Sequence, residues 1–124
     1  MADRLAWESK GLVHFFSGVL TGAELLSAIE MAHADPRFDD AQYAIADFSG
    51  CTDLVVTQAE SDLLSAIAGA AAKSRKETSR SAFVVSDPRL LEKFEHFIRS
   101  PLSPSDTRIF SSLEEARRWA MRRS

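Results

Sequence analysis

The sequence predicts a single α/β domain with one mixed, mostly parallel sheet and covering helices. Three observations support this prediction. The chain has 124 residues, a length that can bury a core without disulfides. Short apolar segments typical of strands alternate with longer amphipathic segments typical of helices, in the order ββαβαβαβα. No internal repeat or change of composition divides the chain, so we expect one domain over residues 1–124.

The first two predicted strands form a hairpin. They cover residues 4–8 and 12–19, and Ser9-Lys10-Gly11 between them is a turn signal. Because strands that alternate with helices favour parallel pairing, this hairpin adds an antiparallel edge to an otherwise parallel sheet.

The first two predicted helices each begin with a capping box, in which the first turn hydrogen-bonds reciprocally with the capping residue. Thr21 and Glu24 open the first helix, and Asp35-Pro36 ends it because the residue before proline avoids helical angles. Thr57 and Glu60 open the second helix, expected from residue 58 to about 76. The residues predicted to be buried are Leu25, Ile29 and Ala32 in the first helix and Leu63, Ile67 and Ala70–Ala71 in the second.

The polar composition of residues 49–56 predicts a loop between the third strand and the second helix. A proline-serine loop is expected over residues 100–106. Buried strands are predicted at 43–48 and 82–86, and a short strand at 108–110. A helix at 88–99 is capped by Asp87, and its apolar stripe consists of Leu90, Leu91, Phe94, Phe97 and Ile98. Ser112 and Glu115 open the last helix.

Charge is distributed unevenly around the net value of −3. Residues 1–62 carry eleven acidic and three basic side chains, whereas residues 63–124 carry seven acidic and twelve basic ones. The basic half indicates either a face that meets phosphates or anionic lipid, or the ordinary preference of helix C-termini for cations. Both interpretations stay open.

The sequence also predicts where the protein resides. The longest stretch without charge covers residues 11–23 and is too short to span a bilayer. Charges at Asp3, Arg4 and Glu8 interrupt the apolar run that a signal peptide needs, and Cys51 has no second cysteine to pair with. We therefore expect a cytoplasmic protein, with peripheral association at the inner membrane face as a variant.

No catalytic signature is present, so we expect neither an enzyme nor a cofactor. The nucleotide-binding, metalloprotease and hydrolase motifs are missing, and the three histidines do not have the spacing of metal ligands. His14 is unusual because it lies in a predicted strand. It faces inward if Leu12 and Phe16 do, and faces solvent or a covering helix if Val13 and Phe15 are the buried pair.

Polar residues gather in the segment 47–57, after the third predicted strand. Crevices at the carboxyl ends of strands in open α/β sheets commonly bind ligands. Asp47, Ser49, Asp53 and Thr57 are therefore candidate contact residues for a ligand or partner. The alternative is that these side chains only satisfy the loop backbone and cap the next helix.

Five segments together resemble the SpoIIAA-like proteins, a family related to the STAS domains of sporulation anti-sigma factor antagonists. They are residues 7–8 (WE), 16–21 (FSGVLT), 35–39 (DPRFD), 46–50 (ADFSG) and 110–119 (FSSLEEARRW). The resemblance implies a non-enzymatic STAS/SpoIIAA-like domain, similar also to CRAL-TRIO lipid-binding domains. Antagonists of this kind carry a phosphorylatable serine at the start of the helix that follows the third strand, whereas residues 53–57 here are DLVVT.

Two functions are consistent with these observations. The first is binding of a small apolar or amphipathic ligand beneath the second and third helices, where small side chains at 66–72 leave space. Its predicted ligand-binding residues are Leu63, Ile67, Ala70, Phe94 and Phe97.

The alternative is a regulatory protein–protein module that uses Asp47, Ser49, Asp53 and Thr57, with a homodimer among its candidate partners. Binding to a membrane surface through Trp119 and the arginines at 117–123 is a variant of the first function. We expect no nucleic-acid partner and no metal.

Overall fold

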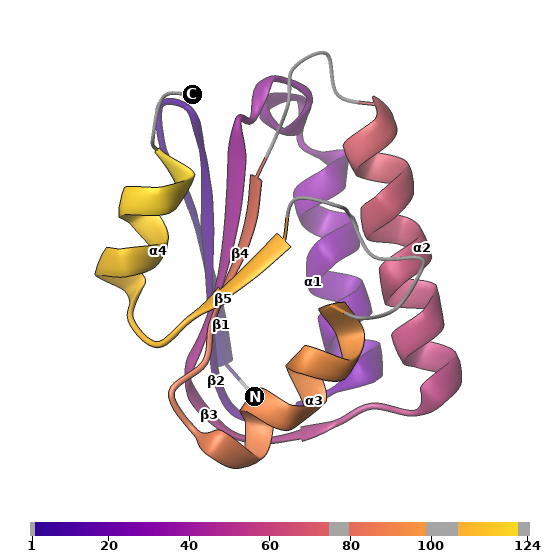
Figure 1. Ribbon diagram of the computed structural model, residues 1–124. Coiled ribbons are helices and arrows are strands. Elements are labelled where there is room, and N and C mark those ends of the chain that lie inside the picture. The colour runs from indigo at the N-terminus through magenta and orange to yellow at the C-terminus, as the bar shows by residue number, and fades with distance from the viewer. Residues whose placement is uncertain (1, 75–79, 99–106, 122–124) are drawn as a thin grey trace.

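The structure is a computed structural model that describes residues 2–74, 80–98 and 107–121. Within these residues the strands form one sheet in the order β1-β2-β3-β4-β5, in which β1 is antiparallel to β2 and every later pair is parallel. The predicted fold class and element order are confirmed (Figure 1). The strands are β1 (Ala2–Trp7), β2 (Gly11–Thr21), β3 (Tyr43–Val55), β4 (Arg80–Val84) and β5 (Thr107–Phe110).

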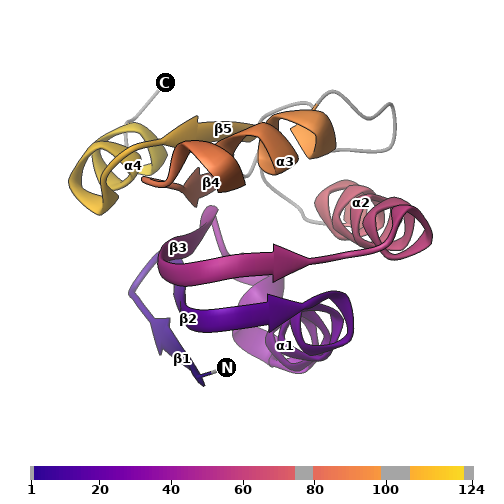
Figure 2. The same ribbon diagram turned by 90° about the horizontal axis from the view of Figure 1, so that it is seen from below.

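The helices cover the two faces of the sheet unequally. Because each parallel strand pairs with the next one in sequence and crossovers are right-handed, the three connecting helices must lie on one face. Figures 1 and 2 show α1, α2 and α3 on that face, here called the three-helix face, and α4 on the other, here called the α4 face. The helices are α1 (Gly22–Ala34), α2 (Gln58–Ser74), α3 (Pro88–Ile98) and α4 (Leu113–Ala120), with a short 3-10 helix, η1 (Pro36–Asp40), after α1.

The predicted helix starts are present. Thr21 Oγ1 accepts a hydrogen bond from the Glu24 backbone N–H at 3.2 Å, and the Glu24 carboxylate accepts one from the Thr21 N–H at 3.1 Å. Thr57 and Glu60 form the same reciprocal pair at 3.1 and 2.9 Å. Side-chain oxygens of Asp87 and Ser112 accept hydrogen bonds from the first turns of α3 and α4.

Both faces of the central strands are buried. In β2 the side chains of His14 and Phe16 lie on the three-helix face, and Val13, the residue before His14, packs under α4. The inward orientation of His14 is therefore the correct one of the two alternatives. Val13 is nevertheless fully buried as well, because α4 covers the opposite face.

The prediction of a loop over residues 49–56 is wrong, because β3 continues to Val55. Its outer half pairs with residues 17–21 of β2, so the backbone groups of this polar segment that face β2 are used in strand pairing. The serine, glycine, threonine and aspartate of this segment resemble loop composition, and the pairing with β2 overrides that local signal.

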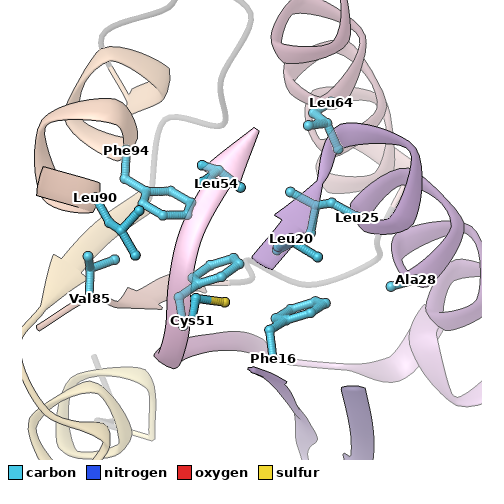
Figure 3. Packing of buried hydrophobic residues seen from close by; sticks show 11 residues of the cluster. Phe16, Leu20, Leu25, Ala28, Cys51, Leu54, Leu64, Val85, Leu90 and Phe94 are labelled. Atoms are coloured by element: carbon cyan, nitrogen blue, oxygen red, sulfur yellow. The ribbon is translucent and has the colours of Figure 1, made fainter. Parts of the chain in front are cut away.

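Two bulges explain why this extension has an unusual burial pattern. Register shifts after Phe15 and after Gly18 of β2 each place one additional residue in β3. The inward-facing residues of β3 are consequently Phe48, Cys51 and Leu54, spaced by three instead of two. Figure 3 shows Cys51 and Leu54 within the cluster that also holds Phe94 of α3 and Leu25 of α1.

The buried face of α2 also differs from the prediction. Leu64 is 5% exposed and belongs to the core, whereas Leu63 is 51% exposed. One residue turns a helix by more than a quarter of a circle, so an error of one position moves a side chain from core to surface. In α1 the buried residues are Leu25, Ala28 and Ala32, with Ile29 partly buried. The loop predicted over 100–106 lies outside the described residues.

A polar network attaches α4 to the β1–β2 turn. The Tyr43 hydroxyl donates to the Glu8 carboxylate, and Arg117 of α4 donates to both carboxylate oxygens at 2.8 and 2.6 Å. Burial and the Glu8 hydrogen bond raise the pKa of Tyr43 to about 12, so the phenol remains a donor near neutral pH. Burial opposes ionisation of Glu8, but the bonds from Tyr43 and Arg117 keep the pKa of its carboxyl below the usual value.

The reactivity of the Cys51 thiol tests whether residues 49–55 extend β3, because this extension buries Cys51. Burial, followed by the charge of Asp47, raises the pKa of the Cys51 thiol to about 11. At pH 8 we expect native protein to react with iodoacetamide about a hundredfold more slowly than the urea-unfolded chain, because the thiolate is correspondingly rarer. Mass spectrometry of timed samples measures both rates. Equal rates would show that residues 49–55 leave the strand.

Candidate functional site

A cavity of about 740 Å³ lies between the three-helix face of the sheet and the helices that cover it. Its floor includes Ala44 and Ala46 of β3 and Ser81 of β4, whose side chains are short. These alanines are only partly buried, although β3 is the middle strand of the sheet. The space is therefore a consequence of small side chains where a packed core would hold large ones.

Aromatic rings form much of the apolar wall. Phe48 is central, with ring-centre distances of 5.0 Å to Phe16 and 4.4 Å to Phe94. Phe83 of β4 lies 5.5 Å from Phe94. The side of the cavity formed by α1, η1 and α2 is also largely apolar and includes Leu25, Ile29, Ala32, Phe38 and Leu64.

The cavity has a polar opening between the N-terminal parts of α2 and α3, here called the mouth. Its residues are mostly exposed, which shows that the cavity reaches solvent on this side. An apolar interior with a polar mouth suits a molecule that has an apolar body and a polar end. The mouth is lined by Thr57, Gln58 and Ser61 of α2 and by Arg89, Glu92, Lys93 and Glu95 of α3.

Two histidines line the cavity away from the mouth. His14 is 5% exposed, and its Nε2 lies 2.8 Å from Asp3 Oδ2 on the neighbouring strand β1. Its ring stacks on Phe16 with centres 4.3 Å apart. His33, in the last turn of α1, lies with its ring centre 4.2 Å from that of Phe38.

The predicted ligand-binding residues are only partly brought together. Phe94 lines the cavity, whereas Leu63 is exposed on the outside of α2. Ile67 is partly buried and is not among the described lining residues. The side chains of Ala70 and Phe97 lie outside the described part of the structure.

The floor of the cavity was not predicted from the sequence. Ala44 and Ala46 alternate with Tyr43 and Ile45, which are each 1% exposed on the α4 face. Alternation of large and small residues along one buried strand was the available signal. It indicates that one face of the strand packs tightly and that the other leaves space.

The predicted contact residues of segment 47–57 have different surroundings in the structure. Asp47 is 7% exposed and accepts hydrogen bonds from the Ser49 backbone N–H at 2.9 Å and hydroxyl at 2.6 Å. Asp53 and Ser49 are exposed on the outer half of β3. Thr57 caps α2.

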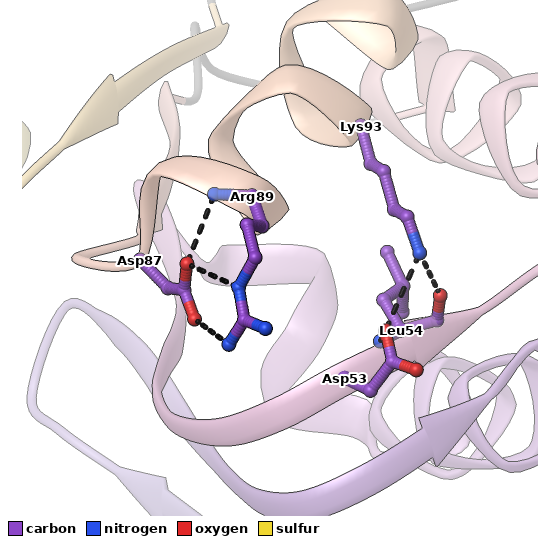
Figure 4. Close-up of polar contacts among 5 residues, drawn as sticks. All are labelled: Asp53, Leu54, Asp87, Arg89 and Lys93. Carbon is purple, nitrogen blue, oxygen red and sulfur yellow. Dashed lines mark hydrogen bonds and ion pairs between the residues drawn. The ribbon is translucent and has the colours of Figure 1, made fainter.

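Lysine 93 connects α3 to the outer end of β3. Its Nζ donates to the Leu54 carbonyl oxygen at 2.6 Å and lies 3.4 Å from Asp53 Oδ1 (Figure 4). The Leu54 backbone N–H, and then Lys93, keep the pKa of Asp53 below its usual value. On the same helix Arg89 pairs with Asp87. These bonds place the mouth of the cavity beside the exposed end of β3.

In the described part of the chain no three histidine, cysteine, aspartate or glutamate side chains group closely enough to hold a metal ion. None of the described helices is long and apolar enough to cross a membrane.

The cavity predicts opposite outcomes for two similar substitutions. Ala46→Leu places a larger side chain in free space, so we expect the free energy of unfolding to stay unchanged or rise by up to about 1 kcal/mol. Ala82, on the other face of the adjacent strand, is fully buried under α4. Ala82→Leu is expected to lose about 1–3 kcal/mol by overpacking. Urea unfolding followed by circular dichroism measures both, and equal losses would contradict the cavity.

Comparisons with known proteins agree on the fold. No protein-family model matches the sequence, and no curated protein does. Among solved structures, the anti-sigma factor antagonist SpoIIAA in its unphosphorylated form superposes with a TM-score of 0.61 at 12% identity, covering 93% of both chains. A DUF3478-family protein of SpoIIAA-like fold from Shewanella loihica PV-4 gives a TM-score of 0.57 at 18% identity, covering 96% of this chain and 92% of that one. The fold implied by the sequence resemblance is thus confirmed: the chain has the SpoIIAA-like fold.

Proposed function

We propose that this domain binds a small apolar or amphipathic molecule in the cavity on the three-helix face. The observation that supports the proposal is the space of about 740 Å³ over the small floor residues of the central strand. Pockets for small molecules have volumes of about 300–1,000 Å³ and walls that are mostly apolar. A core that served only stability would fill this space with side chains.

The shape of the ligand follows from the lining. The five phenylalanine rings among the described lining residues and the aliphatic residues of α1 and α2 suit a hydrocarbon or ring system. The charged mouth suits a polar end or lets the ligand enter from water. A lipid-like molecule combines these properties.

The variant in which the domain binds a membrane surface has less structural support. Arg117 pairs with Glu8, and Trp119 packs on Phe110 with centres 5.6 Å apart. The Trp119 carbonyl oxygen accepts a hydrogen bond from Arg80 at 2.8 Å. These groups stabilise α4, which is the ordinary use of cations near a helix C-terminus. We therefore place the binding function at the cavity.

Ligand binding is tested with a neutral apolar fluorophore, N-phenyl-1-naphthylamine. We expect its fluorescence to rise on binding to the protein, and Ala46→Leu to weaken the affinity at least about tenfold because leucine occupies the site. Leu63→Ala is the matched control, since Leu63 is exposed outside the cavity. The leucine of α2 that lines the cavity is its neighbour, Leu64. Native mass spectrometry of protein from cells shows whether a ligand copurifies. Equal probe affinity in Ala46→Leu would contradict the proposal.

A second candidate function is regulation of a protein partner. It is supported by the similarity in fold to an anti-sigma factor antagonist over 93% of the chain. Ser49, Asp53 and Thr57 are exposed along the outer end of β3 and the start of α2 and would form the contact face. A second copy of the chain is one partner to consider.

Charge reversal tests this face. We expect Asp53→Lys to lose a partner that is retained by Asp40→Lys, an equal change of charge at an exposed residue of η1. Affinity purification from the encoding organism with quantitative mass spectrometry compares the two variants, and native mass spectrometry compares their dimer fractions. Identical partner lists and dimer fractions for both variants would contradict the proposed face.

A further inference from the structure

His14 has one ring nitrogen that the described protein does not satisfy. Nε2 is paired with Asp3, while Nδ1 has no hydrogen bond to any residue within the described ranges. The side chain is only 7% exposed. A buried polar atom without a partner costs about 1–3 kcal/mol, so such atoms usually have a bound water or ligand as partner.

The position of His14 in the sheet directs this nitrogen into the cavity. His14 stands opposite Leu5 of β1 on one side and opposite Ala46 of β3 on the other. The two nitrogens lie on different edges of the imidazole, so a bond from Nε2 to β1 turns the Nδ1 edge toward β3. There Ala44 and Ala46 have no atoms beyond Cβ, and the cavity begins.

The bond with Asp3 determines what Nδ1 can do. An ionised carboxylate only accepts hydrogen bonds, so Nε2 must carry the proton in this pair. In the neutral imidazole Nδ1 is then an acceptor with a free lone pair. Stacking on Phe16, at an angle of 17° between the rings, holds the ring plane in place. An acceptor fixed in an apolar cavity favours a ligand that donates.

We infer that His14 is a specificity-determining residue and that the ligand carries a hydroxyl group that donates a hydrogen bond to its Nδ1. The apolar body of that ligand would lie over Ala44 and Ala46 against Phe94. This inference rests on the proposed ligand-binding function and adds the chemical class: an apolar alcohol or phenol. Asp3 acts as a positioning residue, because it fixes the tautomer without touching the ligand.

The test compares 1-decanol with 1-methoxynonane, an ether of equal size that cannot donate. Affinities are measured by displacement of N-phenyl-1-naphthylamine. For each variant we divide the Kd of the ether by the Kd of the alcohol. The two compounds differ in hydration, but this difference is the same for every variant, so it cancels when the ratios are compared. We expect His14→Phe, which keeps a stacking ring, to lower this ratio about tenfold, the equivalent of one buried hydrogen bond.

Leu63→Phe is the control, because Leu63 is exposed outside the cavity. It should leave the ratio unchanged. An unchanged ratio in His14→Phe, with both compounds still bound, would overturn the inference while leaving the proposed function intact. Failure of both compounds to bind the unsubstituted protein would overturn the inference and the proposed function together.

A measurement without substitution guards against misfolding of the variant. In the ¹⁵N-labelled protein, long-range NMR correlations give the shifts of both His14 nitrogens. Addition of 1-decanol is expected to move the Nδ1 resonance in the direction of a hydrogen-bonded acceptor and to leave Nε2 in its protonated range, whereas 1-methoxynonane should not. If the Nδ1 chemical shift does not change when 1-decanol is added, no ligand hydroxyl is bound to Nδ1, contrary to the inference.

Discussion

Right-handed crossovers between neighbouring parallel strands oblige α1, α2 and α3 to share one face of the sheet, and the position of the cavity depends on this constraint. α4 alone must cover the other face. That side is closed by large side chains, including Tyr43 and Ile45, and by the bonds of Glu8 with Arg117. On the three-helix face the helices are longer, and α1 and α2 pack against each other, so the sheet residues beneath them need not be large.

The two bulges in β3 extend the core on the three-helix face. By bringing Phe48, Cys51 and Leu54 to one face at intervals of three residues, they continue the core beyond the end of β4. Leu54 then lies beneath α3, where Lys93 donates to its carbonyl oxygen. The outer part of β3 is thereby fixed next to the mouth, so the two candidate sites are neighbours although they use different residues.

Features that depend on neighbours in sequence could be predicted, and features that depend on distant partners could not. The capping pairs at Thr21 and Thr57 involve residues three positions apart, and their spacing alone predicts them. The extension of β3 depends on residues of β2 some thirty positions earlier, and its composition favours a loop. Which leucine of α2 faces inward is settled by packing on α1, because both choices fit the helical repeat.

The candidate site shows the same division. Phe94 was predictable from the apolar stripe of its helix, but the floor becomes visible only when Ala44 and Ala46 are seen beside their neighbours in the sheet.

Two departures from good packing then coincide. Small residues stand in the middle of a sheet, and His14, a polar residue in a buried strand, stands directly opposite one of them. An apolar side chain at either position would make a simpler core, and sites where local packing rules are broken together are typical of binding sites. Neither departure alone would argue for a ligand. Their adjacency does, because the free nitrogen and the free space occupy the same place.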